Sequence, residues 1–309
     1  MSAAGPVVCI CGPTASGKSA VADLLAQMLG TDVISVDSMQ VYRGMDIGTA
    51  KTPPAERTVP LQMVDVASIG EDYSASRFQA EARALVDERL AAGETPVLCG
   101  GTGLYLDAVI DEMSFPAGET HGSSREPYER LLAEQGAQAL WELLRERDAA
   151  SAEAIHPNNA KRVVRALEML DEGTSYAAQL AGLHERKPHY EARLWALSRD
   201  RAVLYQRIDE RVDVMMAQGL VDEVRSLVAQ GFGADLTARQ AIGYKEILEA
   251  LAGTITMDEA ASLIKQRSRR YAKRQLSWLR RDGRMRWIDI DELGAEGAAR
   301  QIYAELQQD

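Results

Sequence analysis

The stretch CICGPTASGKSAVADLL, residues 9–25, decides the class of fold. Its residues Gly12–Ser19 match the phosphate-loop pattern G-x-x-x-x-G-K-[ST] in full, between an apolar strand-like run and a helix-like run. Backbone N–H groups of such a loop point at an anion, the positive end of the following helix faces that anion, and Lys18 adds a full charge. The Ser19 hydroxyl is placed to hold a magnesium ion. The predicted phosphate-binding residues are Gly12, Pro13, Thr14, Ala15, Ser16, Gly17, Lys18 and Ser19.

Strand and helix patterns alternate around this loop. Three short apolar runs have the continuous hydrophobic pattern of buried parallel strands: residues 7–11, 33–36 and 97–99. Two helical patterns separate these runs: residues 18–29, ended by Gly30, and residues 74–92, with Ser74 as N-cap and Gly93 as the stop. The alternation predicts an α/β fold, a P-loop NTPase-like parallel sheet flanked by helices and joined by right-handed crossovers.

The pattern changes after residue 105. Residues 125–181 hold helix-forming segments separated by polar breaks, without a convincing strand pattern. The sheet is expected to resume at residues 192–198, and a later short strand at residues 285–290. We therefore expect a discontinuous α/β core, residues 1–115 and 190–309, interrupted by an all-helical insertion domain, residues 116–189.

The composition is that of an ordinary soluble globular protein. The 309 residues are 46% hydrophobic and 26% charged, enough for one large domain or two smaller ones. No apolar run approaches the roughly 20 residues that span a bilayer, and the N-terminus lacks the features of a signal peptide, so a cytoplasmic protein is expected. The three cysteines fall in predicted strands, where buried small hydrophobic residues are expected rather than a disulfide framework or a zinc site.

The net charge of −11 conceals a basic segment. Residues 265–286 hold ten Lys or Arg and one acid, a local charge of +9 that leaves about −20 on the rest of the chain. On a helical wheel, one arc is expected to pack inward: Ile264, Ser268, Tyr271, Ala272, Gln275, Trp278 and Leu279. The opposite arc is cationic: Lys265, Arg267, Arg269, Arg270, Lys273, Arg274, Arg280 and Arg281. A merely solvated face usually mixes both signs of charge, so this arc favours an anionic polymer as partner.

Polar residues and glycines follow the second and third predicted strands. Asp37 comes directly after residues 33–36, at the strand end where the ligand crevice of an open parallel sheet lies. It could be a general base, a magnesium ligand or a turn cap. Gly100, Gly101 and Thr102 stand where an NTPase has an acid for Mg²⁺ and the attacking water, although two glycines can also mark a simple tight turn. Most phosphate loops bind ATP or GTP, so a small-molecule kinase with Asp37 as base remains an alternative.

Seven motifs run in series along nearly the whole chain: GPTASGKS (12–19), DSMQVYRGMDIGTAK (37–51), GGTGLYLDAVID (100–111), IHPNNAKRVVRALE (155–168), YQRIDERVDVMMAQGLVDEV (205–224), RQAIGYKE (239–246) and AKRQLSWLR (272–280). In this order they resemble those of bacterial tRNA dimethylallyltransferases, also called tRNA isopentenyltransferases. Departures are few: Ser19 and Asn159 stand where that family often has Thr and Asp, and the segment SFPAGETHGSSREP (114–127) is idiosyncratic.

The resemblance implies transfer of a dimethylallyl group from dimethylallyl diphosphate to the N6 amine of adenosine 37 in tRNA. The phosphate loop would then hold the diphosphate that leaves, which accounts for the missing NTPase acid. As the amine attacks it becomes acidic, so Asp37 can take its proton. Lys18, Mg²⁺ near Ser19, and Arg211 would stabilise the departing diphosphate. Thr102 is expected to line the reaction channel and to hydrogen-bond the adenine or its ribose.

The resemblance also implies contacts with tRNA, whose target base must leave the loop stack to react. The insertion would grip the anticodon stem-loop, with Lys161 and Arg165 on one helix face able to meet phosphates. The residues implied to meet tRNA are Asp37, Ser38, Met39, Gln40, Thr102, Arg125, Lys161, Arg162, Val163, Val164, Arg165, Gln240, Ala241, Ile242, Gly243, Tyr244 and Lys245. A monomer is expected. A non-catalytic RNA-binding protein with a relic loop is the second alternative.

Overall fold

A computed structural model describes residues 6–115, 125–184, 187–232 and 237–308. The chain divides into two compact units: Met1–Ile110 with Pro188–Asp309, and Asp111–Lys187. The sequence placed these junctions at residues 115/116 and 189/190. Within the described residues, no helix is both long and apolar enough to cross a membrane.

The first unit is built on a six-stranded parallel sheet, in the order β3-β2-β4-β1-β5-β6. Its strands are β1 (Val7–Cys11), β2 (Val33–Val36), β3 (Leu61–Gln62), β4 (Val97–Gly100), β5 (Ala192–Ser198) and β6 (Met285–Asp289). The predicted α/β class and the five predicted strands are confirmed. The sequence did not predict β3, because a two-residue edge strand carries no hydrophobic pattern of its own.

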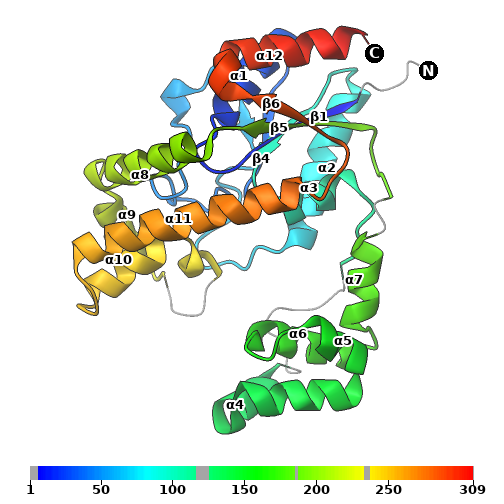
Figure 1. Cartoon of the computed structure of the whole chain (residues 1–309), viewed down its shortest axis with the longest axis vertical. Helices are drawn as coiled ribbons and strands as arrows, with labels where there is room; N and C mark the ends of the chain where they lie inside the picture. Colours follow the sequence, from blue (N-terminus) through cyan, green and yellow to red (C-terminus); the bar gives the residue numbers. More distant parts are fainter. Residues whose placement is uncertain (1–5, 116–124, 185–186, 233–236, 309) are drawn as a thin grey trace. The chain divides into compact units, whose positions relative to one another are not determined.

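Helices cover both faces of this sheet. Alternate residues of β1 enter different cores: Cys9 and Cys11 pack on one face, Val8 and Ile10 on the other. Side chains buried on both faces are what a continuous apolar run predicts. On the second face α1 (Lys18–Leu29) lies against α12 (Ile290–Gln308), as Figure 1 shows.

The remaining helices of this unit lie toward the first face or beyond the sheet edge: α2 (Ala75–Ala91), α3 (Gly103–Ile110), α8 (Arg201–Ala217), α9 (Leu220–Ala229), α10 (Tyr244–Leu251) and α11 (Met257–Leu279), with short 3₁₀ turns η1 (Pro54–Glu56) and η2 (Thr237–Gln240). The predicted caps are confirmed. Ser74 Oγ accepts from Arg77 N at 3.1 Å at the start of α2, and Gly30 ends α1 with a left-handed φ of 69°.

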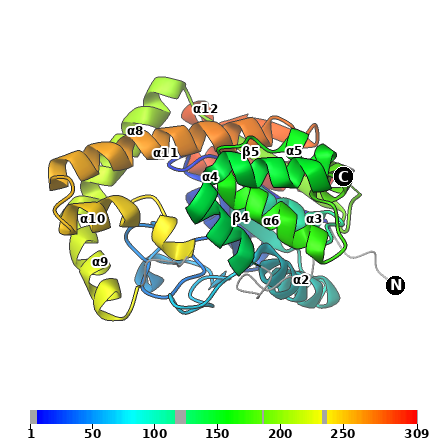
Figure 2. The same cartoon turned by 90° about the horizontal axis from the view of Figure 1, so that it is seen from below.

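The basic helix α11 packs by the face that the sequence predicted. Its inward arc is buried or half-buried, and the helix runs alongside α8 and α10 (Figure 1, Figure 2). The cations of the opposite arc are less available to a partner than predicted, because acids of neighbouring helices, which a helical wheel does not include, pair with some of them. Three of its cations form ion pairs: Lys265 with Asp213, Arg267 with Glu246, and Arg269 with Asp209. The exposed cations of this arc are Arg270, Lys273, Arg274, Arg280 and Arg281.

The second unit is helical in its described part, as predicted. Its helices are α4 (Glu126–Arg147), α5 (Ala149–Ala154), α6 (Ala160–Asp171) and α7 (Tyr176–His184). A separate core holds them together, with Leu140, Leu144, Val163 and Leu167 fully buried. The indole N–H of Trp141 donates to the carbonyls of α5 and its C-cap, which closes the corner between α4 and α5.

Candidate active site

The phosphate loop joins β1 to α1 and has the backbone of an anion site. Gly17 takes a left-handed φ of 96° just before α1, and Ala15 takes a φ of 62°, which is unusual for a residue with a side chain. A side chain at Gly12 would place its Cβ 2.6 Å from Ser16 Oγ, so glycine here lets Ser16 approach the start of the loop closely. The loop therefore folds tightly before the positive end of α1.

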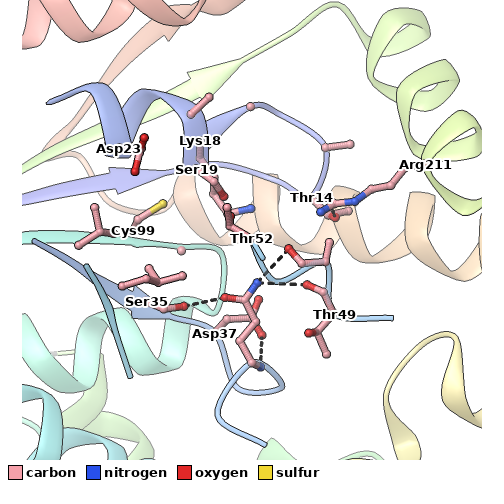
Figure 3. Close-up of a pocket in the computed structure, with 18 of the residues that line it drawn as sticks. Thr14, Lys18, Ser19, Asp23, Ser35, Asp37, Thr49, Thr52, Cys99 and Arg211 are labelled. Atoms are coloured by element: carbon pink, nitrogen blue, oxygen red, sulfur yellow. Dashed lines mark hydrogen bonds between the residues drawn. The ribbon is translucent and has the colours of Figure 1, made fainter. Parts of the chain in front are cut away.

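A cavity of about 670 Å³ opens over this loop. Lys18 and Ser19 line it from the loop, Asp37 from the end of β2, Gly100 from the end of β4, and Arg211 from α8 (Figure 3). Asp37 and Gly100 thus lie at the same edge of the sheet as the phosphate loop, as expected. A second cavity, of about 270 Å³, shares Asp37 and Arg211 with the first. Its wall is mostly apolar, with residues of α8 and the 240–243 segment.

Asp37 stands where the two cavities meet. Its Oδ1 accepts hydrogen bonds from Met39 N at 2.9 Å and Gln40 N at 3.3 Å. The turn-cap role is therefore real, but it uses one oxygen, and Oδ2 has no hydrogen-bond partner among the described residues. The side chain of Gln40 ties the turn to the opposite wall by donating to Thr49 O at 3.1 Å. Capping thus holds the carboxylate in one orientation while leaving an oxygen for chemistry.

Cations gather opposite this carboxylate. Arg211 Nη1 donates to Thr14 Oγ1 at 3.3 Å, and Figure 3 shows its side chain extending from α8 toward the loop. Burial lowers the pKa of Arg211, and the charge of Asp37 partly opposes this. Burial also lowers the pKa of Lys18 from its usual 10.5, and the nearby Arg211 adds to that shift. Cations held in a desolvated cavity favour a bound anion.

Family comparisons agree with this geometry. A model described as "IPP transferase" matches residues 40–282, and one described as "Isopentenyl transferase" matches residues 5–59. The chain belongs to the IPP transferase family. A relative from Geobacillus thermodenitrificans named tRNA dimethylallyltransferase is 46% identical over 288 residues, which cover 93% of this chain and 91% of the relative. One of the same name from Desulforudis audaxviator is 39% identical over 311 residues, which cover 100% of both chains.

Two solved structures of related transferases share the fold. A tRNA delta(2)-isopentenylpyrophosphate transferase from Staphylococcus epidermidis has a TM-score of 0.72 and 35% identity, covering 98% of this chain and 100% of that one. A eukaryotic dimethylallyltransferase described as acting on tRNA has a TM-score of 0.82 and 27% identity, covering 99% of this chain and 79% of that one. The P-loop NTPase-like fold of this IPP transferase is thereby confirmed.

Thr102 holds the turn beside the cavities, and its expected contact with the adenine or ribose stays a prediction. Its Oγ1 accepts from Ser38 N at 3.2 Å, so it supports the turn that carries Asp37. Thr102 is not among the residues that line either cavity. Tyr271 of α11 lines both cavities instead; burial raises the pKa of its phenol to about 12, and the charge of Asp37 adds to the shift. The predicted packing arc contained Tyr271, but nothing in the sequence tied it to the site.

Two further arginines contact the phosphate loop, and the sequence did not predict them. Arg199 Nε donates to Ser16 O at 3.0 Å, and Arg207 Nε donates to Ala15 O at 3.3 Å. With Arg211 on Thr14, three arginines hold three successive loop residues. Arg207 lies one helical turn before Arg211, so the i, i+4 spacing was the available signal.

Only part of the 240–245 segment lines a cavity. Ala241, Ile242 and Gly243 line the second cavity, where a base of the tRNA could contact them as the resemblance implies. The side chain of Tyr244 is fully buried and donates to Glu223 Oε1 at 2.6 Å. The prediction that Tyr244 meets tRNA is therefore wrong for its side chain. The Glu223 carboxylate also accepts from the backbone N–H groups of residues 46–48, so Tyr244 helps to fix the cavity wall.

In the insertion, Lys161 and Arg162 are exposed, whereas Val163 and Val164 are 0% and 1% exposed. The prediction that the two valines meet tRNA is wrong for their side chains, which fill the core under α6. Their apolar spacing with Leu167 was the signal that could have shown this.

Two further implied tRNA contacts, Arg125 and Arg165, are partly engaged within the insertion. Both approach the buried Glu168, with N–O distances of 3.9 and 3.5 Å. Burial raises the pKa of Glu168, and the two arginines oppose that shift.

The residues at the phosphate loop fit a magnesium ion that is bound together with a diphosphate. Mg²⁺ is usually held by one or two protein oxygens together with phosphate oxygens and water. Ser19 offers such an oxygen at the cavity wall beside Lys18. Among the described residues, no group of three or more His, Cys, Asp or Glu could hold a metal by itself.

Proposed function

We propose that this chain transfers the dimethylallyl group of dimethylallyl diphosphate to the N6 amine of adenosine 37 in tRNA. The observation that carries the proposal is the position of Asp37, with a free carboxylate oxygen between the phosphate-loop cavity and the second, mostly apolar cavity. An electrophile held by its diphosphate on one side and a nucleophilic base entering from the other would meet there. The names of the relatives support the same reaction.

The chain's own residues account for the chemistry. A bond forms between N6 and the allylic carbon, the bond from that carbon to the diphosphate oxygen breaks, and Asp37 takes the N6 proton. The amine becomes acidic as it attacks, so a carboxylate placed beside it can take the proton. Lys18 and Arg211 face the charge that builds on the leaving diphosphate. A Mg²⁺ bound at Ser19 would supply further neutralisation of that charge.

Recognition of tRNA is proposed for two surfaces. The exposed cations of α11 and those at the start of α6 suit phosphate contacts, which position a nucleic acid without reading its sequence. The insertion is proposed to grip the anticodon stem-loop, and such contacts can offset the few kcal/mol needed to unstack the target base. The protein is proposed to act as a monomer in the cytoplasm.

The kinase alternative rests on the loop motif and on Asp37 alone. It explains neither the exposed cations of α11 nor the position of the second cavity, and no family match favours it. The deciding experiment offers unmodified tRNA together with either dimethylallyl diphosphate or ATP, each carrying an isotope label in the group to be transferred. We expect N6-dimethylallyladenosine in the digested tRNA by mass spectrometry, with label from the prenyl donor. Transfer from ATP alone would overturn the proposal.

A relic phosphate loop on an RNA-binding protein would give a third result in the same experiment. In that case tRNA would bind, no label would enter it from either donor, and Asp37→Asn would change nothing. Any prenyl transfer above the no-enzyme control excludes this alternative.

A further inference from the structure

Gln275 joins α11 to two loops of the active site. Its Oε1 accepts from Thr14 N at 2.8 Å in the phosphate loop. Its Nε2 donates to Gly101 O at 3.0 Å in the loop after β4. The side chain is 6% exposed, and its partners lie 261 and 174 residues away along the chain. Because a buried amide needs partners for both ends, each loop is held at a defined distance from the other.

The glycine at position 101 is explained by this contact. A Cβ there would lie 2.2 Å from Gln275 Nε2 and 3.0 Å from Gly12 O. Gly100 has a separate reason, since its Cβ would lie 2.0 Å from Val36 O of the paired strand β2. Gly101 is therefore more than part of a tight turn, because it leaves the space that lets Gln275 reach the phosphate loop.

The contact acts on the most constrained part of the loop. Thr14 is held by its backbone N–H on Gln275 and by its hydroxyl on Arg211. The next residue, Ala15, keeps a φ of 62°, a conformation that persists only where the surroundings hold it. Without Gln275, the Pro13–Thr14 peptide would lose the hydrogen bond that fixes its N–H, and the loop backbone that follows would lose part of its support.

We infer that Gln275 is a positioning residue for the diphosphate: through Thr14 and Gly101 it sets the loop geometry that binds and aligns the leaving group. For the identity of that group, the inference rests on the proposed function. This positioning role differs from a purely structural role because the loss of Gln275 should weaken binding of the diphosphate and not binding of tRNA. The cationic face of α11, which points away from Gln275 on the wheel, should bind tRNA as before.

The first test compares Gln275→Met with the wild type. Methionine keeps the length of the side chain and removes both hydrogen bonds, each typically worth enough to change an equilibrium several-fold. We expect kcat/KM for dimethylallyl diphosphate to fall by about tenfold or more, and inorganic pyrophosphate with Mg²⁺ to bind correspondingly more weakly by calorimetry. The Kd for tRNA should stay near the wild-type value, because the exposed cations of α11 are unchanged. Gln266→Met, at an exposed position of the same helix, is the matched control and should change none of these.

The second test is a double-mutant cycle that asks whether Gly101 acts through Gln275. Gly101→Ala should weaken pyrophosphate binding because the new methyl group displaces the Gln275 amide. Once Gln275→Ala has removed that amide, Gly101→Ala should cost much less, so the two losses should not add. Fully additive losses, or pyrophosphate affinity within about twofold of the wild type in Gln275→Met, would overturn the inference.

Pyrophosphate binding keeps this inference separate from the proposed function. If the wild type bound pyrophosphate but transferred no prenyl group to tRNA, the proposed function would fail while the effect of Gln275→Met on pyrophosphate could still be measured. If the wild type transferred the prenyl group normally but Gln275→Met lost tRNA affinity in parallel with pyrophosphate affinity, the positioning role alone would fail.

Discussion

The two carboxylate oxygens of Asp37 have different surroundings, which would let one residue serve both the fold and the proposed reaction. Oδ1 caps the turn through Met39 and Gln40, while Oδ2 is left for a proton. The sequence predicted Asp37, Lys18 and Arg211 from motifs, and the structure brings them to one cavity. The sequence could not predict that Gln275 bridges two loops, because an amide that contacts distant segments leaves no local pattern.

Asp37→Asn separates the two functions of that carboxylate. The asparagine oxygen can still cap the turn, but the amide cannot accept the N6 proton, so kcat should fall by about 100- to 10,000-fold while tRNA binding is retained. Single-turnover transfer and a filter-binding assay measure the two quantities. Asp222→Asn, on the exposed side of α9, is the control and should react like the wild type. Near-normal turnover by Asp37→Asn would remove Asp37 as the base.

Glu168 should make the stability of the insertion depend on pH. Burial raises its pKa in the folded state, so the folded protein binds the proton more readily than the unfolded chain does. Its favourable contribution is therefore complete below the unfolded pKa and is lost as pH rises through the folded pKa. Denaturation curves measured across mildly acid to neutral pH should show this decline in the wild type and a smaller one in Glu168→Gln. An equal decline in both proteins would assign the pH dependence to other groups.

At the scale of elements, α11 presents different residues to the site and to solvent. Tyr271, Gln275 and Trp278 face the catalytic loops, and Trp278 packs so closely on Gly103 that a Cβ there would lie 2.3 Å from its ring. The helical wheel predicted these faces because periodicity is a local property. It missed the acids of α8 and α10 that neutralise the first cations of the helix, because those acids come from other segments.

Removing exposed cations of α11 should weaken tRNA binding, because these side chains are proposed to meet phosphates. Lys273→Ala with Arg280→Ala should raise the Kd for tRNA and reduce the slope of log Kd against log salt by about one for each phosphate that is no longer neutralised. Binding is measured over a salt series, with pyrophosphate affinity as the internal check. Arg300→Ala, which removes an exposed cation of α12 paired with Glu296, should leave the salt slope unchanged. A slope unaltered in the double variant would exclude these positions from the tRNA surface.

At the scale of the whole molecule, the chain contains two units, each with its own core. The chain leaves and re-enters the first unit at adjacent points, since His189 N donates to Ile110 O at 2.8 Å. The insertion is therefore a continuous segment that begins and ends at one place on the sheet unit. Its helices pack around Leu140, Leu144 and Leu167.

Replacing residues 111–187 by a short Gly/Ser linker should leave the first unit folded. Because Ile110 and His189 are already hydrogen-bonded, the linker closes a short gap at little entropic cost. The shortened protein should unfold in one cooperative transition and bind pyrophosphate like the full chain, but transfer to tRNA should be lost. Calorimetry and the nucleoside assay measure these properties. Retained transfer at the wild-type rate would show that the insertion does not grip the substrate.

The sequence by itself determined the sheet class, most element boundaries, the phosphate loop and the place of Asp37 at a strand end. These follow from local patterns: apolar runs, helix caps and a loop whose spacing is dictated by the anion it surrounds. Tertiary structure alone decided which predicted contacts are buried, as for Tyr244 and Val164, and which distant side chains hold the loop, as for Gln275. The physical reason is that burial and hydrogen bonding between remote segments depend on packing in three dimensions, which spacing along the chain does not encode.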